Sequence, residues 1–465
     1  MHKLLKNNKL AKERIKSNYT KQSKKNLQMK NLKIEFTDKE ITSWGGMVLL
    51  GKMLEKMSID EELKKINLPT QGSNRGYSPL QLIKTFWISL WSGANKFEHL
   101  EVTRQDKVIA EIFGWKRMPG HRAFQRYFNK FNQGINQEVF GKLYEWFFDN
   151  LKFDNYTLDI DSTIMPRYGN QQGSKKGYNP KKPGRNSHHP LIAFISDIKM
   201  VANFWLRAGN SYTANNFKGF LCDTLEKLKS KKIGLIRLDS GFYGKEIFNY
   251  LEEKTINYIV AARLYTPIKR KLAYQETWLK LDEGIEIAEV EYQSLEWKKP
   301  RRMIMVRQEI NKRPKAVGKQ FRIFENEEIY KNYRYSAFIT NMDLPAKVIY
   351  DLYRNRANAE NRIKELKYDF GADSFNVRNF WATEAALNFV MIGYNIMSLF
   401  KQMILQSPKE HQLSTLRYRV FAIGSYLVKN GNQKILKLSL AMKRRKWFLG
   451  LWNSTDFIRF PFVVN

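Results

Sequence analysis

The spacing of apolar residues along this chain changes near Asn155, and that change limits the folds open to it. Residues from about 36 to 152 carry apolar side chains every three or four positions, as in GGMVLLGKMLEKM and SPLQLIKTFWISLW, which predicts helices. From Asn155 the pattern is that of strands, because YTLDID places Asp159 and Asp161 on one face and its apolar residues on the other. We therefore expect a helical region followed by a sheet.

The rest of the chain predicts a mixed α/β fold. Strand-like runs are followed by helices that alternate with strands up to about residue 262, a pattern typical of a sheet covered by helices. Residues from about 263 to 335 interrupt this order with aromatic-rich segments such as IEIAEVEYQSLEW, which indicate an inserted β-subdomain. One long helix is then expected from about Pro345 to Gly371, and the chain beyond about residue 376 is expected to be helical and basic.

One face of the predicted long helix is charged where a core-facing helix would be apolar. At about 100° per residue, Tyr353, Arg356, Glu360 and Lys367 fall within roughly a 60° arc. A carboxylate between two cations suits a metal ligand within a phosphate-binding surface. The alternative is a solvated face with ion pairs one turn apart.

The overall charge favours the first interpretation. The chain has a formal net charge of +35, which is typical of a protein with a polyanionic partner. Ribosomal and membrane-surface proteins share this bias, but few of them have 465 residues of which 43% are hydrophobic. A single cysteine excludes a disulfide framework and a cysteine-based zinc cluster, and it suits a reducing compartment.

Neither the N-terminal residues nor the longest apolar stretch of the chain predicts membrane attachment. The first 33 residues alternate basic and polar side chains without an apolar run, so we expect a mobile basic arm and no secretory signal. The longest apolar stretch, residues 385–405, contains Asn388, Tyr394 and Lys401. It is therefore expected to be a buried helix and not a membrane span.

Two aspartates, Asp161 and Asp239, lie at the ends of predicted strands. Asp161 lies in DIDST and Asp239 in RLDSGFYG, at positions where the carboxyl ends of neighbouring strands form ligand sites. Together with Glu360 they would supply oxygen ligands for a pair of Mg²⁺ ions about 4 Å apart. Asp159 shares a strand face with Asp161 and competes with it as the first ligand.

A helix-turn-helix pattern precedes the sheet region. The segment DKVIAEIFGWKRMPGHRAFQRYFNKF predicts two helices, and the second carries an inward stripe of phenylalanines. Basic residues recur every four positions on another face, at Arg122, Arg126 and Lys130. This helix is either a DNA-reading helix or an ordinary helix with a basic outer face.

At these residues the chain resembles the DDE transposases of bacterial insertion sequences. Tyr353, Arg356, Glu360 and Lys367 match their YREK signature, in which two, three and six residues separate the four positions. The stretch YRNRANAENRIKELKYDFG is especially similar to the branch called DDE group 1.

The resemblance extends from about residue 155 to 371. DST from Asp161 and DSGFY from Asp239 are similar to the segments that carry the first and second aspartates of that family. The family's first aspartate directly precedes a Ser/Thr pair, which selects Asp161 over Asp159.

The resemblance implies a fold and a reaction. The fold would be an RNase H-like α/β core, with a mixed sheet and flanking helices, interrupted by a β-rich insertion between helical N- and C-terminal regions. The reaction would be cut-and-paste transposition, in which the enzyme cleaves transposon ends and joins them to target DNA.

Residue roles follow from the same resemblance. Asp161, Asp239 and Glu360 would be the catalytic residues and would bind two Mg²⁺ ions, for which Mn²⁺ can substitute. Arg356 and Lys367 would hold DNA phosphates.

Tyr353 would position the DNA strand. An aromatic residue of the insertion stacks on a flipped base in related enzymes, and Trp278 and Trp297 are the candidates; the alternative for each is burial in the β-domain. His188 and His189 are excluded from the site and expected to contact phosphate or solvent in a basic loop.

The implied partners are double-stranded DNA, both terminal inverted repeats and target, and a second copy of the chain in a homodimer, in the cytoplasm with the bacterial nucleoid. One alternative is a catalytically inactive, transposase-derived DNA-binding protein; another is a stand-alone RNase H-like nuclease.

The expected regions are a basic arm (1–35), a helical DNA-binding domain (36–152), a first core part (153–262), the β-rich insertion (263–335), a second core part with the Glu360 helix (336–375) and a helical region with a possible dimerisation role (376–465).

Overall fold

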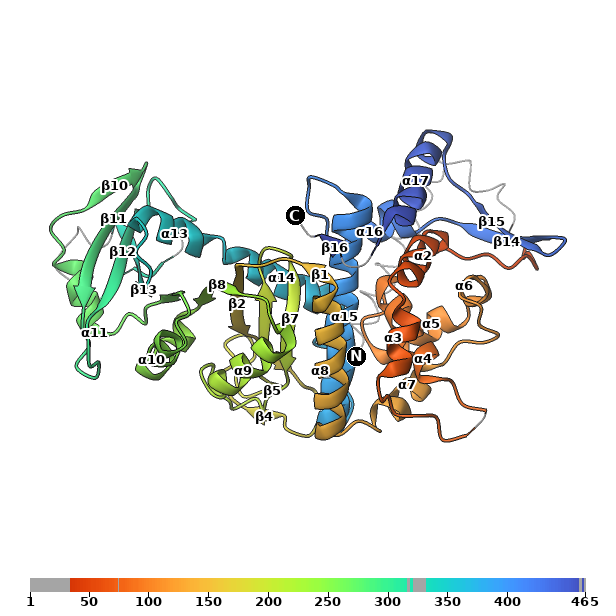
Figure 1. Cartoon of the computed structure of the whole chain (residues 1–465), viewed down its shortest axis with the longest axis horizontal. Coiled ribbons are helices and arrows are strands. Elements are labelled where there is room, and N and C mark those ends of the chain that lie inside the picture. The colour runs from red at the N-terminus through yellow and green to blue at the C-terminus, as the bar shows by residue number, and fades with distance from the viewer. Residues whose placement is uncertain (1–33, 74, 316–317, 321–331, 460–461, 464–465) are drawn as a thin grey trace, which may run out of the picture. The chain divides into compact units, whose positions relative to one another are not determined.

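The structure is a computed structural model that describes residues 34–73, 75–315, 318–320, 332–459 and 462–463 (Figure 1). Residues 41–465 form one compact unit, and residues 1–40 belong to a second unit. The predicted basic arm lies outside the described residues except for its last two positions. The expected region boundaries inside the compact unit stay predictions.

Helices make up the first part of the compact unit, as the apolar spacing predicts. Side chains cap three of them, because Ser78, Asp106 and Asn132 each accept a hydrogen bond from a backbone N–H of the first turn. The helices are α2 (Val48–Lys56), α3 (Ile59–Lys65), α4 (Pro79–Trp91), α5 (Leu100–Arg104), α6 (Lys107–Ile112), α7 (His121–Phe128) and α8 (Gln133–Asp149), with short 3₁₀ turns at Gly45–Met47 and Phe97–His99.

A nine-stranded mixed sheet follows, in the order β10-β11-β12-β13-β9-β8-β2-β6-β7. The pairs β2–β8 and β8–β9 are parallel, and the other neighbours are antiparallel. The strands are β2 (Tyr156–Ser162), β6 (Leu191–Ile195), β7 (Met200–Trp205), β8 (Ile233–Leu238), β9 (Tyr258–Ala261), β10 (Leu279–Asp282), β11 (Ile285–Tyr292), β12 (Arg301–Glu309) and β13 (Tyr333–Thr340).

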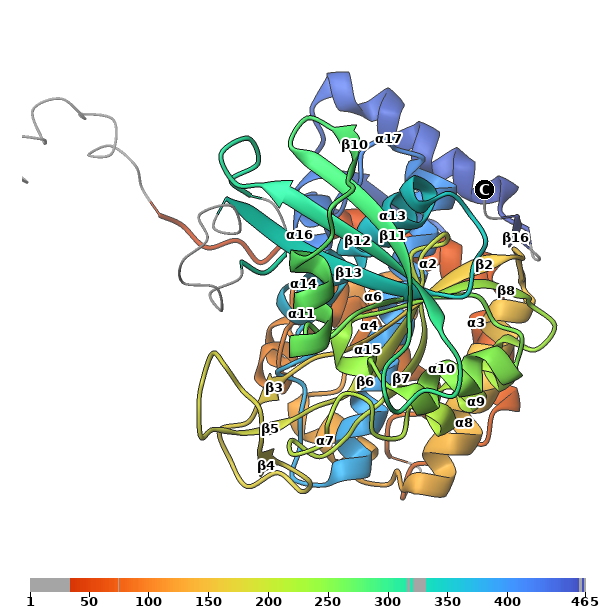
Figure 2. The ribbon, with the colours of Figure 1, turned by 90° about the vertical axis from the view of Figure 1, so that its left-hand side faces the viewer.

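The strands of the expected insertion continue the central sheet. β10, β11 and β12 join it through β13, which pairs with β9, and Figure 2 shows β11, β12 and β13 side by side. The helices between the strands are α9 (Phe217–Leu228), α10 (Lys245–Glu253) and α11 (Thr266–Ala273), with a 3₁₀ turn at Ser240–Phe242. Three short strands, β3 (Met165–Pro166), β4 (Lys175–Lys176) and β5 (Asn186–His188), pair within the basic loop.

The predicted long helix is wrong in one respect, because the structure divides it. α13 (Ala346–Arg354) and α14 (Ala357–Tyr368) are separated by Asn355 and Arg356. Hydrogen bonds three residues apart tighten the chain there, as in the bond from Arg356 N to the Tyr353 carbonyl at 3.0 Å. The helix is interrupted at the position where the side chain of Arg356 is buried.

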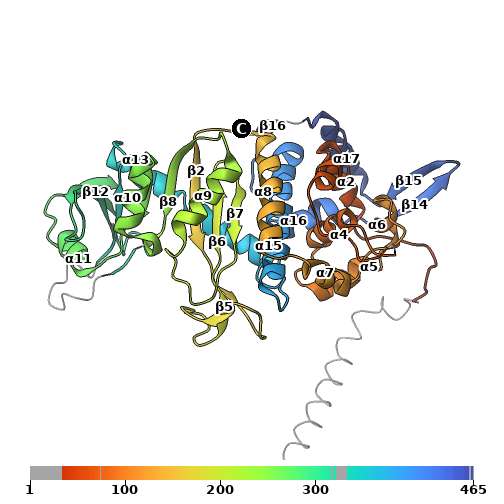
Figure 3. The ribbon, with the colours of Figure 1, turned by 60° about the horizontal axis from the view of Figure 1, so that its bottom comes forward.

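Helix α15 (Phe380–Phe400) joins the sheet to the helical region. It contacts β7, α4 and α8, and it lies alongside α8 in Figures 1 and 3. Every side chain from Ala382 to Phe400 is buried, which confirms the prediction of a buried helix. In the described part of the chain, no helix has both the length and the apolar character needed to cross a membrane.

The C-terminal region is not as helical as predicted. It contains a β-hairpin, whose two-residue turn Gly431-Asn432 places Gly431 at a φ of 58°. A Gly-Asn pair between two strand-like segments is a hairpin signal. The region comprises a π-helical turn (Lys401–Leu405), α16 (Leu413–Leu416), a second π turn (Arg417–Phe421), β14 (Ser425–Asn430), β15 (Gln433–Leu438), α17 (Met442–Ser454), a 3₁₀ turn (Thr455–Phe457) and β16 (Phe462–Val463), which pairs with β1 (Leu151–Lys152).

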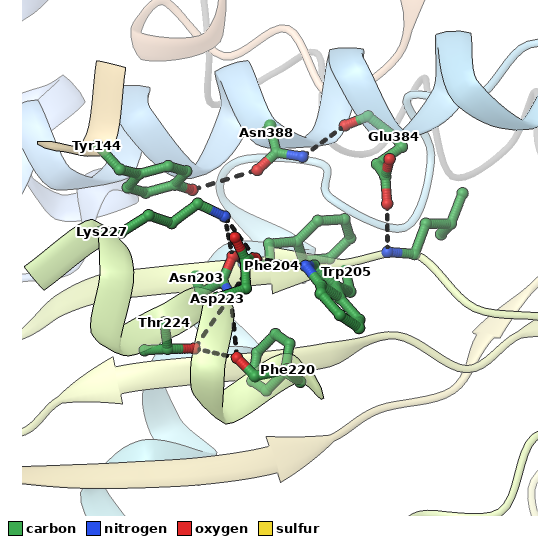
Figure 4. A network of polar contacts seen from close by, with 11 residues as sticks. Tyr144, Asn203, Phe204, Trp205, Phe220, Asp223, Thr224, Lys227, Glu384 and Asn388 are labelled. Atoms are coloured by element: carbon green, nitrogen blue, oxygen red, sulfur yellow. Dashed lines mark hydrogen bonds and ion pairs between the residues drawn. The ribbon is translucent and has the colours of Figure 1, made fainter. Parts of the chain in front are cut away.

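A buried polar network ties α9 and α15 to β7 (Figure 4). Lys227 donates to Asp223 and to Asn203, each at 2.7 Å. Glu384 of α15 accepts a hydrogen bond from the backbone N–H of Leu206 at 3.0 Å. These bonds fix the sheet against the helices that support its edge.

Candidate active site

Two aspartates meet at the centre of the sheet. Asp161 lies near the end of β2 and Asp239 directly follows β8, its parallel neighbour. Parallel neighbours end at the same edge of a sheet, so both carboxylates face one place. The Asp239 carboxylate also accepts a hydrogen bond from the N–H of Gly241 at 2.9 Å, which fixes its direction.

The electrostatics of Asp161 are those of a crowded acidic centre. Burial is the main cause that raises its pKa to about 6, and Arg356 opposes this rise. The negative charges of Asp239 and Glu360 raise the pKa further. The three predicted acidic residues therefore lie within electrostatic reach of one another.

Glu360 is the least enclosed of the three. It lies in the first turn of α14 and is exposed. Among the described residues, no three His, Cys, Asp or Glu side chains are grouped closely enough to hold a metal ion. The fold thus brings Asp161 and Asp239 together at the sheet edge and places Glu360 beside them without closing a ligand set.

Arg356 faces this centre from the break between α13 and α14. Its Nη2 atom lies 2.9 Å from Oδ2 of Asp161, and the residue is 6% exposed. The contact is an ion pair without the alignment of a hydrogen bond, and Nε and Nη2 of Arg356 have no hydrogen-bond acceptor in the part of the chain described. Buried guanidinium donors without acceptors are costly, so these atoms are suited to bind an anion in addition to Asp161.

The other two signature residues border the same centre. The hydroxyl of Tyr353 donates to the carbonyl of Leu238 at 3.3 Å, directly before Asp239, and burial raises its pKa to about 12. Lys367 donates to the carbonyl of Ile164 at 2.8 Å, and burial lowers its pKa to about 8.

Asp159 has a different role from Asp161. It is fully buried, and both its carboxylate oxygens accept hydrogen bonds from Arg237, at 2.7 and 2.8 Å. Arg237 lies opposite it on β8 and also donates to the Leu352 carbonyl at 2.5 Å. With both oxygens occupied, Asp159 is a structural ion pair that anchors α13 to the sheet.

Three polar residues beside the aspartates were missed or misjudged from the sequence. Ser162 Oγ lies 3.0 Å from Nε2 of His189 and 3.2 Å from Oγ1 of Thr213. The expectation that His188 and His189 contact phosphate or solvent is wrong, because both are buried. Their place in a basic loop misled the prediction; the only available signal was that they directly precede a strand.

The predicted basic helix is formed, with the expected inner face. The phenylalanine stripe of α7 and its following turn is buried, at Phe124, Phe128 and Phe131. Arg122 and Arg126 are exposed on α7. Lys130 is also exposed, but it follows the helix and donates to the carbonyl of Thr70 at 2.6 Å. Contact between these cations and DNA stays a prediction.

The two candidate tryptophans are both packed. Trp297 is 6% exposed and has Arg301 over its ring at 4.8 Å. Trp278 is partly buried, with Arg307 over its ring at 4.6 Å. Either ring needs a rearrangement before it can stack on a base.

The donor set at the sheet edge suits a divalent metal ion. Carboxylate oxygens are the ligands that Mg²⁺ prefers. Burial, and to a lesser extent Asp239 and Glu360, raises the pKa of Asp161, so a cation there would stabilise its ionised form. In this structure the guanidinium of Arg356 supplies that positive charge. An acidic centre that attracts cations, bordered by Arg356 and Lys367, is the kind of site that acts on phosphate esters.

Comparisons with known proteins agree with this kind of site. The chain belongs to the family described as Transposase DDE domain group 1, whose model matches residues 24–455. It is therefore a DDE transposase, an enzyme that acts on DNA, from a family that generally uses divalent metals.

No curated protein matches the sequence. Among solved structures, the chain is similar to a chain of the piggyBac transposase synaptic complex with hairpin DNA, at 10% identity and a TM-score of 0.44, over 80% of this chain and 78% of that one. It is also similar to a chain of the Mos1 strand transfer complex, at 12% identity and a TM-score of 0.15, over 48% and 78%.

Proposed function

We propose that this protein is the cut-and-paste transposase of a bacterial insertion sequence. It cleaves DNA at the two terminal inverted repeats and joins the freed 3′-hydroxyl groups to target DNA. The observation that carries the proposal is the meeting of Asp161 and Asp239 at the ends of parallel strands, with Glu360 and the buried Arg356 beside them. Both reactions are phosphoryl transfers and need one site.

Asp161, Asp239 and Glu360 are the proposed ligands of two Mg²⁺ ions, for which Mn²⁺ can substitute. When bound, such ions make an attacking oxygen more nucleophilic and stabilise the leaving oxygen. Glu360 is exposed at the start of α14, within electrostatic reach of Asp161.

Arg356, Lys367 and Tyr353 are the proposed DNA-positioning residues. Nε and Nη2 of Arg356 lack acceptors among the described atoms and suit a bidentate contact with a phosphate. Lys367 holds a second phosphate, and burial of its amino group makes that contact stronger than one at an open surface. The Tyr353 ring supports the strand beside Asp239.

The finer fold assignment is also a proposal. The antiparallel strands β7, β6 and β2, followed by β8 and β9 parallel to β2, have the order expected for an RNase H-like core. β10, β11 and β12 are then the β-rich insertion. The helices before the core, with Arg122, Arg126 and Lys130, recognise the transposon ends, and the C-terminal region pairs two copies in a homodimer. The protein works at the bacterial nucleoid in the cytoplasm.

A strand-transfer assay tests the proposal. Purified protein is incubated with Mg²⁺ and a duplex that carries the inverted repeat found beside the coding region, together with a supercoiled target plasmid. The expected products are cleaved ends and ends joined to the plasmid, and both disappear when EDTA removes the metal. Binding without cleavage would instead identify an inactive DNA-binding protein, and cleavage without joining a stand-alone nuclease.

A further inference from the structure

A second face of helix α14 borders a cavity of about 780 Å³. The cavity is also lined by the end of α15, by the π turn Lys401–Leu405 and by the loop that follows it. From α14 it is lined by Asn358, Asn361, Arg362 and Glu365. Nothing in the proposed reaction uses these residues.

The cavity lies away from the catalytic side of α14. Its four residues on that helix recur at intervals of three and four, so they form one stripe. At about 100° per residue, Glu360 points roughly 160° away from Arg362. Ligands bound on the two faces therefore share one helix without competing for space.

Arg362 makes the cavity a built site. It is 8% exposed, and its Nη2 atom donates to the carbonyl of Ser196 at 3.1 Å. Its Nη1 atom is buried without a hydrogen-bond acceptor among the residues described. Asp159 is near enough to sense this charge, but Arg237 already occupies both its oxygens. A buried donor that borders a cavity in this way is free to bind an acceptor within it.

The charged side chains that line the cavity have a net positive charge, which favours an anionic ligand. Two carboxylates line it, and each has its own lysine: Glu365 pairs with Lys401 at 2.7 Å and Glu410 with Lys199 at 2.5 Å. Arg362 and Lys409 are the two further cations of the lining. Neither forms an ion pair within 4 Å in the described part of the chain, although the charge of Arg362 reaches Glu410.

The histidine of the cavity is neutral in this field. Burial and the positive charges of Arg419, Lys401 and Lys409 lower the pKa of His411. Its neutral ring, with the amides of Asn358 and Asn361, adds polar groups that suit an oxygen-rich anion.

We propose that this cavity binds a phosphate group, through Arg362 and Lys409, and that the phosphate belongs to the backbone of bound DNA. The DNA source rests on the proposed function, whereas the phosphate site rests on the cavity alone. A second strand segment held behind α14 would press on the helix that carries Glu360. Free phosphate or a nucleotide has the same chemistry and is the other source that the test separates.

The first arm of the test uses inorganic phosphate as the probe. Thermal melting of the full-length protein is followed against phosphate at constant ionic strength, with chloride as the balancing anion. We expect saturable stabilisation in the wild type and an apparent affinity roughly tenfold weaker in Arg362→Gln and in Lys409→Ala. Lys364→Ala, which removes an exposed lysine of α14 outside the cavity lining, is the matched control and should behave as wild type.

The second arm identifies the source. Affinity for a duplex is measured from low to moderate salt, and loss of one phosphate contact should reduce the slope of log K against log salt by about 1 in Lys409→Ala. An unchanged slope together with weakened phosphate binding would assign the cavity to free phosphate or a nucleotide and overturn the DNA source. Equal phosphate stabilisation in the wild type and both variants would overturn the site.

Neither arm depends on cleavage. A wild-type protein that binds phosphate but cleaves nothing would refute the proposed transposition and leave the cavity assignment standing. Circular dichroism and melting in chloride would reveal whether Arg362→Gln fails to fold. In that case both measurements use Lys409→Ala alone, because Lys409 is exposed and its replacement should not affect folding.

Discussion

Two polar clusters in this protein differ in how completely their charges are partnered. In the network of Figure 4, Asp223 accepts hydrogen bonds from Asn203, Trp205 and Lys227, at 2.6 to 2.8 Å. At the acidic centre, Asp161 has one ion pair, with Arg356, whose buried Nε and Nη2 atoms lack acceptors among the described residues. A partnered cluster fixes the fold, whereas an incompletely partnered one is reserved for a ligand.

The same difference separates two aspartates on one strand face. Asp159 has both oxygens hydrogen-bonded to Arg237. Asp161, two residues on, accepts a hydrogen bond from the N–H of Ser162 at 2.8 Å, has an ion pair with Arg356 and lies near two other carboxylates. Sequence alternation predicts the shared face but not which of the two forms the hydrogen-bonded ion pair. Mutations at the two clusters should therefore separate loss of activity from loss of stability.

The largest effect is expected at the acidic centre. Asp161→Ala, Asp239→Ala and Glu360→Ala should each abolish cleavage and joining, because the three residues are the proposed metal ligands, and each should leave binding of transposon ends largely intact. Gel-based cleavage beside a binding assay measures both. Asp223→Ala is the comparison variant, which should lower the melting temperature and leave activity per folded molecule unchanged.

The ion pair on β2 should give the largest effect on stability. Asp159→Ala leaves the Arg237 guanidinium buried and unpaired, which costs about 3–5 kcal/mol. Asp161→Asn should destabilise the protein less: it takes the carboxylate away from Arg356, but burial, Asp239 and Glu360 all disfavour the ionised form of that carboxylate. Urea unfolding at pH 7 distinguishes them. An active, stable Asp159→Ala variant beside an unstable Asp161→Asn variant would reverse the two roles.

Glu384 is the exception within the partnered network, and it predicts a pH effect of roughly 3 kcal/mol. Burial raises its pKa from 4.5 to about 7, despite hydrogen bonds from Asn136 and Leu206. The folded state thus holds this proton more tightly than the unfolded state. Its contribution to stability is full below about pH 4.5 and is lost as the pH rises to 7.

Glu384→Gln should remove that dependence. The difference in melting temperature between this variant and the wild type should shift in favour of the variant from pH 5 to 7.5, above a constant offset from the altered hydrogen bonds. Because both proteins carry the same other titrating groups, those contributions cancel. A difference that stays flat with pH would mean that Glu384 is already ionised at pH 5.

A smaller effect is expected at Arg356, the proposed phosphate contact. Arg356→Lys keeps the positive charge near Asp161 but cannot reproduce a bidentate contact with phosphate. We expect cleavage about 10- to 100-fold slower in single-turnover experiments at saturating protein, with end affinity changed less than about threefold. Melting beside the kinetics excludes unfolding. A wild-type rate in this variant would limit Arg356 to balancing the charge of Asp161.

Local patterns predicted those parts of the molecule that depend on local physics. Alternation at Asp159 and Asp161 gave a strand, and the spacing of Phe124, Phe128 and Phe131 gave an inner helix face, both present in the structure. The spacing of Tyr353, Arg356, Glu360 and Lys367 predicted that they share one site, and in the structure they lie around Asp161 and Asp239. Their individual roles stay a prediction.

The features that escaped prediction depend on distant partners. The break before α14 follows from the burial of Arg356 against Asp161, which are far apart in sequence. The bond between Asp159 and Arg237 needs the register of β2 with β8. The cavity behind α14 collects side chains from four segments, and nothing in the local pattern of Arg362 marks it as unpartnered.

The smallest predicted effect extends the comparison to the basic surface of α7. Arg122 and Arg126 are exposed and have no hydrogen bond or ion pair among the described residues, whereas Lys130 already donates to the Thr70 carbonyl. If unpartnered groups are the ones kept for a ligand, Arg122→Ala and Arg126→Ala should each weaken binding of transposon ends about fivefold, and Lys130→Ala by less.

The test needs the full-length protein. Trp87 and Trp91 of α4 donate to the carbonyls of Phe389 and Gly393 on α15, so a fragment that ends near residue 150 would lose part of its own core. Each variant is compared on an end duplex and on a random duplex of equal length at moderate salt, where phosphate contacts alone are weakened. Equal losses on both duplexes would assign α7 to phosphate contacts. Loss confined to the end duplex would assign it to sequence recognition, and a Lys130 effect as large as that of Arg126 would break the rule that links free donors to ligand binding.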